Sequence, residues 1–197
     1  MTELTVLDDP AAALAEMLAD AAEAGGHVVL AGGSSYKRAY ELAAARDSDW
    51  SRTTVWYGDE RCVPPDHELS NHAMAQAALL SRLQAPPEVV RMQGELGPDA
   101  HTASLFPGKP EVEERSRLVV GVELAGMEPQ VPRISLSLPA LNSGRRTVFL
   151  VTGADKAKAV ARAFGDTPDG DSPAAHVRPR AGQLLVFCDP AAAKELV

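Results

Sequence analysis

The hydrophobic residues of this chain form short apolar runs that predict β-strands. The run at 27–31 is apolar without alternation, which is typical of a strand buried on both faces. Residues 134–138 instead alternate strictly between apolar and polar, as a half-buried strand does. In all, strands are predicted at residues 27–31, 53–57, 88–92, 117–122, 134–138, 147–152 and 184–187.

Between these runs, apolar residues recur at spacings of three and four, which indicates amphipathic helices. The first helix carries Leu14, Met17 and Leu18, and it follows an Asp9–Pro10 pair that suits a helix start. Strands that alternate with helices predict the α/β class, with a doubly wound, mostly parallel sheet and helices on both faces, in one domain over residues 1–197. Further helices are predicted after residues 32–35, from residue 70, at 139–142, after 153–156 and from residue 189.

Composition narrows the class of protein. The formal net charge of −8 at pH 7 argues against a general nucleic-acid binder, because such proteins are usually basic. Cys62 and Cys188 lie far apart and outside any metal-binding pattern, which indicates a reducing compartment and no metal site. No apolar run reaches membrane-spanning length, and the N-terminus lacks a signal-peptide pattern. We therefore expect a cytoplasmic protein without a nucleic-acid or membrane partner.

A glycine turn at residues 32–35 follows the first predicted strand and precedes a helix. This geometry presents free backbone N–H groups to an anion at the helix N-terminus. Gly33 would let a phosphate approach the backbone closely, and the hydroxyls of Ser34 and Ser35 add donors. The turn matches neither a Walker A loop nor a dinucleotide fingerprint. On its own it therefore fits a plain tight turn as well as a phosphate site.

Three charged residues, Asp59, Glu60 and Arg61, follow the strand at 53–57. Ligands of open parallel sheets bind beyond the carboxyl ends of the strands, so this is a favourable place for a site. Arg61 can grip a phosphate or carboxylate with two parallel hydrogen bonds, and Asp59 can orient Arg61 or a catalytic histidine. The stiff Pro64–Pro65 segment favours a site over a solvated loop.

The polar segment at residues 97–108 places His101 among Thr102, Ser104 and Asp99. Imidazole titrates near neutral pH, so His101 can take a proton from water and give it back. A lone histidine is ordinarily an incidental surface residue, and it is the rest of the chain that favours a catalytic role here.

Two further cations stand where an anionic ligand can reach them. Arg133 precedes the strand at 134–138, and Lys156 lies at the strand-to-helix junction after 147–152. An exposed lysine without a ligand is a common alternative for Lys156. An acidic protein that binds an anion needs such a local basic pocket.

Taken in order, these segments resemble the 6-phosphogluconolactonase family, within the glucosamine-6-phosphate isomerase/deaminase-like superfamily. Two stretches are specific: Asp-Glu-Arg-Cys-Val-Pro-Pro-Asp-His at 59–67 and Gly-Pro-Asp-Ala-His-Thr-Ala-Ser-Leu-Phe-Pro-Gly at 97–108. The resemblance covers nearly the whole chain. Weaker matches lie at residues 30–35, 70–71, 91–95, 133–142 and 152–156.

The resemblance implies hydrolysis of 6-phospho-D-glucono-1,5-lactone to 6-phosphogluconate in the oxidative pentose phosphate pathway, without a metal or organic cofactor. It implies that His101 is the general base on water and that Asp59 is an acidic residue of the site. The expected partner is a small-molecule sugar phosphate. Gly33, Ser34, Arg61 and Lys156 match family positions around the phosphate and sugar, and the residues themselves add Ser35 and Arg133 to the expected contacts.

Two features depart from the family pattern. Ala100 stands where the family usually has glycine, and a positive φ there would cost about 1 kcal/mol or somewhat more. The larger departure is that only Gly97 to Ala100 separate Leu96 from His101, where the family has a helix and an apolar strand. A parallel neighbour needs a crossover of about a dozen residues or more. The His101 loop therefore hangs directly from the third strand, or the sheet is rearranged, or it has a gap.

Three functions stay open on the sequence alone. The first is an active lactonase. The short connection before His101 motivates the second, a catalytically impaired sugar-phosphate-binding paralogue. The third is a hexosamine-6-phosphate deaminase or isomerase, against which the His-Thr-Ala-Ser-Leu-Phe-Pro stretch argues. We expect a monomer or a weak homo-oligomer.

Overall fold

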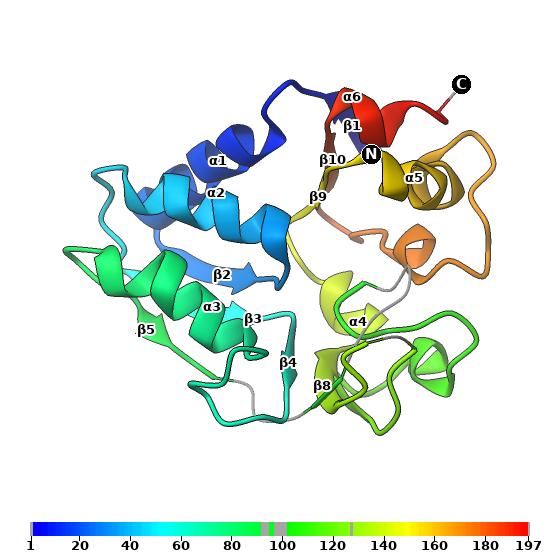
Figure 1. Ribbon diagram of the computed structural model, residues 1–197, viewed down its shortest axis with the longest axis horizontal. Helices are drawn as coiled ribbons and strands as arrows, with labels where there is room; N and C mark the ends of the chain where they lie inside the picture. The colour runs from blue at the N-terminus through cyan, green and yellow to red at the C-terminus, as the bar shows by residue number, and fades with distance from the viewer. Residues whose placement is uncertain (1, 92–94, 97–101, 127, 197) are drawn as a thin grey trace.

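The fold contains two parallel three-stranded sheets. A computed structural model describes residues 2–91, 95–96, 102–126 and 128–196. All strand pairs within these two sheets are parallel, which confirms the expected α/β class. One sheet consists, in order, of β1 (Thr2–Val6), β10 (Gln183–Cys188) and β9 (Arg146–Val151), and the other of β2 (Gly26–Leu30), β3 (Thr53–Tyr57) and β5 (Glu88–Val89) (Figure 1).

Helices cover both faces of the first sheet. Leu150 and Phe187 pack into the core cluster that includes α1 (Pro10–Ala24). Val151 and Cys188 pack from the other face against α5 (Ala157–Phe164) and α6 (Pro190–Ala193). The alternation along β9 and β10 thus reflects burial on both sides, as a doubly wound sheet requires. No helix among the described residues is long and apolar enough to cross a membrane.

The second sheet has one covered face and one open face. The helices α1, α2 (Ser34–Ala44) and α3 (Asn71–Ala78) contribute to the core on the side of Val55 and Tyr57 (Figure 1). On the other side, Val29 is 50% exposed and Trp56 is 37% exposed. This sheet therefore carries an unusual amount of apolar surface on one face.

The two parallel sheets are not joined into one. Among the described residues, β2 and β9 are edge strands and do not pair with each other. Tyrosines of α2 instead meet the backbone there: the Tyr40 hydroxyl hydrogen-bonds the amide and carbonyl of Ala31, both at 2.8 Å, and the Tyr36 hydroxyl accepts from the Leu150 amide at 3.3 Å. Of the three arrangements expected for the shortened chain, the described residues therefore show the gap.

A four-stranded antiparallel sheet holds the charged residues. Its central strand is β8, which pairs with each of the other three strands. Leu105, Phe106 and Val120 belong to a second core cluster that supports this sheet and extends to Leu138. The strands are β4 (Asp59–Arg61), β6 (Glu95–Leu96), β7 (Val119–Val122) and β8 (Pro132–Leu136), and the remaining short elements are η1 (Leu80–Arg82), η2 (Pro110–Glu113), α4 (Leu138–Leu141), η3 (Ala154–Lys156) and η4 (Pro173–His176).

The structure differs from the predicted strands at four places in particular. The pattern does not predict β1, because this edge strand is exposed or half-buried along its length and has no apolar run. Residues 59–61 read as a loop, yet they form β4, because β8 supplies their backbone partners. The strand predicted at 88–92 is only β5, and the strand predicted at 134–138 lies two residues earlier, since α4 begins at Leu138.

Truncating valines on the two faces of the β2–β3 pair should have unequal effects. Val55→Ala should lower the free energy of unfolding by about 2 kcal/mol, because it removes buried methyl groups and leaves a cavity. Val29→Ala should change it by less than about 0.5 kcal/mol, because half of that side chain is already in water. Urea denaturation of both variants checks this, and equal losses would mean that the Val29 face is covered in solution.

Candidate active site

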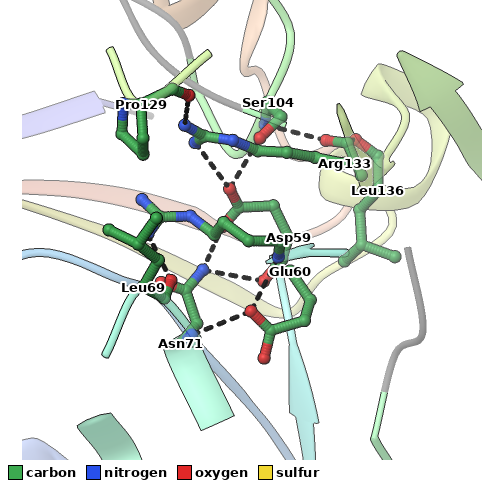
Figure 2. A network of polar contacts seen from close by, with 10 residues as sticks. Asp59, Glu60, Leu69, Asn71, Ser104, Pro129, Arg133 and Leu136 are labelled. Carbon is green, nitrogen blue, oxygen red and sulfur yellow. Dashed lines mark hydrogen bonds and ion pairs between the residues drawn. The ribbon is translucent and has the colours of Figure 1, made fainter. Parts of the chain in front are cut away.

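Asp59 lies buried at the start of β4, where three other elements converge on its carboxylate. Its Oδ1 accepts a hydrogen bond from Asn71 Nδ2 at 3.0 Å, and its Oδ2 accepts one from Ser104 Oγ at 2.6 Å (Figure 2). Arg133 Nη1 lies 3.8 Å from Oδ2. Burial raises the pKa of Asp59, whereas the Ser104 hydrogen bond and the charges of Arg61 and Arg133 lower it. The site therefore contains a desolvated carboxyl group that is held from both sides.

Arg61 and Arg133 stand directly opposite each other in the β4–β8 pair. Opposed residues share a face of the sheet, and like charges at such positions are destabilising. Arg61 Nη1 donates to the Leu69 carbonyl at 2.7 Å, and Arg133 Nη2 donates to the Pro129 carbonyl at 3.2 Å (Figure 2). Within the part of the chain that the structure describes, the buried Nε atoms of both arginines and Arg133 Nη1 have no hydrogen-bond partner. An anion between the two side chains would satisfy these donors.

The charge on Arg133 is poorly accommodated without such an anion. Its side chain is almost completely buried. Burial first, and then the positive charge of Arg61, lower the pKa of Arg133 to about 9. The guanidinium is still protonated at neutral pH, so the shift reflects destabilisation of a charge that is present. A bound phosphate or carboxylate would act in the opposite direction.

Glu60 fixes the start of α3 beside this cluster. Its carboxylate accepts from the backbone amides of Asn71 and His72 at 2.8 and 2.7 Å, and from Ser70 Oγ at 3.0 Å. Ser70 is the helix N-cap and accepts from the Ala73 amide at 3.1 Å. An anionic side chain at this end satisfies free N–H groups and complements the helix dipole. Asn71 is therefore presented to Asp59 from a well-anchored first turn.

Asn71 also connects Asp59 to the glycine turn. Its Nδ2 donates to the Asp59 backbone carbonyl at 2.9 Å as well as to the side chain. A Cβ at Gly32 would lie only 2.1 Å from Asn71 Oδ1, so glycine is needed there for close approach. Gly33 has a φ of 108°, where glycine is favoured for conformational reasons.

The glycine turn lies at the N-terminus of α2 and reaches the turn after β9. Ser34 and Ser35 are the first residues of this helix, and no described side chain caps it. Ser35 Oγ and Thr152 Oγ1 form a 2.5 Å hydrogen bond. A helix end without a side-chain cap suits an anion, and the phosphate site expected at this turn stays a prediction.

Lys156 has a different setting from the other predicted site residues. It lies in η3 and forms an exposed ion pair with Asp155 at 2.6 Å. The structure therefore does not draw Lys156 into the Asp59 cluster, although Thr152, four residues earlier, hydrogen-bonds Ser35 of the glycine turn. Exposed ion pairs contribute about 0–1 kcal/mol, so this pairing would not prevent Lys156 from contacting a ligand.

The predicted general base, His101, lies outside the described residues, as do Asp99 and Ala100. The described chain resumes at Thr102 with a tight turn, in which the Leu105 amide donates to the Thr102 carbonyl at 3.0 Å. Ala103 in this turn has a φ of 52°, a conformation that L-residues rarely adopt.

A comparison with protein families places this geometry in context. The family model described as glucosamine-6-phosphate isomerases/6-phosphogluconolactonase matches residues 2–96 and 94–186. The chain belongs to this family. The match breaks into two parts at the short connection before His101, where the sequence departs from the family pattern.

Individual members of the family agree with this assignment. The chain is 33% identical over 206 aligned positions to a 6-phosphogluconolactonase of Nostoc sp., with 86% of this chain and 84% of the relative covered. It is 34% identical over 188 positions to the human 6-phosphogluconolactonase, with 79% and 72% covered. The crystal structure of 6-phosphogluconolactonase from Thermotoga maritima superposes with a TM-score of 0.78 at 26% identity, covering 96% of this chain and 100% of the other. The first alignment spans 206 positions, which is more than the 197 residues of this chain. The Nostoc relative therefore has residues that have no counterpart here.

Three site residues were not assigned a role from the sequence: Glu60, Asn71 and Ser104. Glu60 and Ser70 could have been found as a charged cap for a helix that begins at residue 71, since serine and an acidic residue favour helix N-termini. The contact of Ser104 with Asp59 joins residues 45 positions apart and has no local signal. Within the described residues, no group of three or more His, Cys, Asp or Glu side chains is placed to hold a metal ion.

Replacing Gly32 should disturb the site through Asn71. Gly32→Ala should lower the free energy of unfolding by about 1–3 kcal/mol, because the new Cβ displaces the Asn71 amide from a buried carboxylate. In an Asn71→Ala background the same substitution should cost much less, because the obstructing side chain is gone. A double-mutant cycle by urea denaturation measures the difference.

Gly121→Ala is the matched control, because a Cβ at Gly121 meets nothing within 4 Å. An equal cost of Gly32→Ala with and without the Asn71 side chain would contradict the proposed cause.

Proposed function

We propose that this family member hydrolyses 6-phospho-D-glucono-1,5-lactone to 6-phosphogluconate in the oxidative pentose phosphate pathway. Its relatives named 6-phosphogluconolactonase support a lactone-hydrolysing enzyme. The observation that carries the substrate assignment is the opposed Arg61–Arg133 pair beside buried Asp59, because an anionic sugar would satisfy its spare donors. We further propose that the protein acts in the cytoplasm, needs no cofactor and is a monomer or a weak homo-oligomer.

The phosphate would be held by cations and backbone amides from separate elements. Arg61 and Arg133 supply guanidinium donors from β4 and β8. Gly33, Ser34 and Ser35 supply the start of α2. Lys156 would exchange its exposed partner Asp155 for the ligand. Such a site can select a dianionic phosphate although the protein as a whole is acidic.

The chemical step would need one base and one fixed acidic group. His101 would take a proton from water as the oxygen attacks the lactone carbonyl, and would return it to the ring oxygen when the carbon–oxygen bond breaks. Asp59 would orient His101 and stabilise its protonated form, the role for which a carboxylate beside a catalytic imidazole is suited. The role of His101 carries over from the family motif. Asp59 matches an acidic residue of the family site, and its orienting role is inferred from its chemistry.

The gap between β2 and β9 favours a second candidate function, sugar-phosphate binding without catalysis. A protein that binds 6-phosphogluconate but lacks turnover would keep the Asp59 and arginine cluster while the shortened connection misplaces His101. A hexosamine-6-phosphate deaminase is the weaker third alternative, and release of ammonia from glucosamine-6-phosphate would be its positive sign.

His101 should be essential for turnover. Its removal eliminates general-base catalysis, so His101→Ala should lower kcat/KM by at least about a hundredfold while circular dichroism stays unchanged. The assay follows 6-phosphogluconate formation from freshly generated lactone, with spontaneous hydrolysis subtracted. His176→Ala, an exposed histidine in η4, is the control and should retain full activity. A wild-type rate equal to spontaneous hydrolysis, together with measurable 6-phosphogluconate binding, would favour the non-catalytic binder instead.

Arg61 should determine phosphate affinity. Arg61→Met removes donors to the phosphate at similar side-chain volume, so 6-phosphogluconate should bind at least about tenfold more weakly by calorimetry. Arg46→Met is a suitable control, because Arg46 makes only an exposed ion pair with Glu16. Unchanged affinity of the Arg61 variant would remove this residue from the proposed phosphate site.

A further inference from the structure

Ser104 hydrogen-bonds both Asp59 and Ser135, which lie opposite each other in the β4–β8 pair. Its Oγ donates to Asp59 Oδ2 at 2.6 Å, and its backbone amide donates to Ser135 Oγ at 2.9 Å. Asp59 and Ser135 are direct partners across the β4–β8 pair. All three residues are buried, and Ser104 and Ser135 are fully so. Ser104 therefore ties its own turn to both strands at one point (Figure 2).

This hydrogen bond fixes the orientation of the Asp59 carboxylate. Asn71 donates to Oδ1 from α3, and Ser104 donates to Oδ2 from the opposite direction (Figure 2). Hydrogen bonds from a hydroxyl to an ionised carboxylate are short and about twice as strong as neutral ones. Arg133 Nη1, at 3.8 Å from Oδ2, is too distant to replace Ser104 without movement.

The same contact secures the turn that follows His101 in the sequence. Ala103, next to Ser104, has a positive φ, a conformation that is unfavourable for an L-residue. The fully buried Leu105 and Phe106 anchor the other side of the turn in the core. The strained backbone is thus held by apolar burial after Ser104 and by the two Ser104 hydrogen bonds.

We propose that Ser104 is a positioning residue for the hydrolytic site: it orients the Asp59 carboxylate and holds the turn after His101 against β4 and β8. The inference rests on the proposed lactonase function. Ser104 acts through Asp59, to which its hydroxyl group donates a hydrogen bond. Its loss would leave the carboxylate free to rotate toward Arg133 and would loosen the backbone next to the base.

The kinetic test compares Ser104→Ala with Ser137→Ala. Ser137 is also fully buried and also donates one 2.6 Å hydrogen bond, but its acceptor is the Arg117 carbonyl, away from Asp59. Ser104→Ala should lower kcat at least about tenfold with KM changed less than about threefold, because an interaction with a charged group of the catalytic machinery is lost while the phosphate contacts remain. Ser137→Ala should leave both constants within about twofold of the wild type.

A second measurement separates an action through Asp59 from general destabilisation. Among the residues that the structure describes, the charged and titratable groups that act on or are influenced by Asp59 are Arg61, Glu60, Arg133, Tyr36 and Tyr40, and all are kept in these variants. Burial raises the pKa of Asp59, so ionisation of this group costs stability as pH rises through its folded value. Removing the Ser104 donor makes that cost larger. The loss of unfolding free energy in Ser104→Ala should therefore be about twice as large at pH 7 as at a pH below the Asp59 titration.

Two comparisons complete this second test. The loss caused by Ser137→Ala should not depend on pH, because its acceptor is a backbone carbonyl. In an Asp59→Asn background, the loss caused by Ser104→Ala should also become independent of pH.

The outcomes distinguish this inference from the proposed function. A wild-type protein that does not accelerate lactone hydrolysis overturns the proposed function, and the role of Ser104 in catalysis with it. An active wild type with a Ser104→Ala variant that keeps its kcat overturns the positioning role alone. An equal loss of kcat in Ser104→Ala and Ser137→Ala would also overturn it, because the effect would then follow from lost packing.

Discussion

The site depends on the contacts that stabilise the buried carboxylate of Asp59. An ionised carboxyl group in a protein interior is stable only when hydrogen bonds and opposite charge replace its water. Here the replacements come from α3, the turn at Ser104 and β8, which are remote from each other in sequence. Removing one hydrogen-bond donor from such a buried carboxylate costs about 1–3 kcal/mol, because the group is then left partly unsatisfied in the interior. The same contacts therefore assemble the site and join the β2–β3–β5 sheet to the antiparallel sheet.

This arrangement explains how the proposed anion-binding cluster is compatible with a divided sheet. The glycine turn follows β2, Asp59 and Arg61 follow β3, and Arg133 comes from β8. None of these elements requires a strand between β2 and β9 to hold it. Tyr36 and Tyr40 contribute hydroxyl partners for backbone groups beside the gap, which limits the cost of unpaired edges. The shortened connection therefore bears on the proposed role of His101 and on the exposed Val29 face, and much less on the arginine pair.

How far the sequence could predict this site depended on whether the signal was local. The glycine turn and the charged residues after β3 are recognisable, because strand, turn and helix patterns are encoded within a few residues. The family resemblance supplied His101, whose local sequence alone would have been weak. By contrast, β4 exists because β8 pairs with it, and the opposition of Arg61 and Arg133 follows from that register. Strand pairing joins residues more than 70 positions apart, and hydrophobic periodicity carries no information about it. The edge strand β1 escaped prediction for a related reason, since its partial burial leaves no apolar run.

The electrostatics of the cluster favour a site that is prepared for its ligand. Asp59 lies near both arginines, so it offsets part of their mutual repulsion before a ligand arrives. Because Arg133 Nη1 remains 3.8 Å from the carboxylate, the pair is attracted without the guanidinium donors being consumed. A tighter Asp59–Arg133 hydrogen bond would stabilise the empty site more and would have to break when a phosphate binds. Ser104 and Asn71 engage both carboxylate oxygens, which opposes such a contact and leaves the guanidinium donors available for the proposed anion.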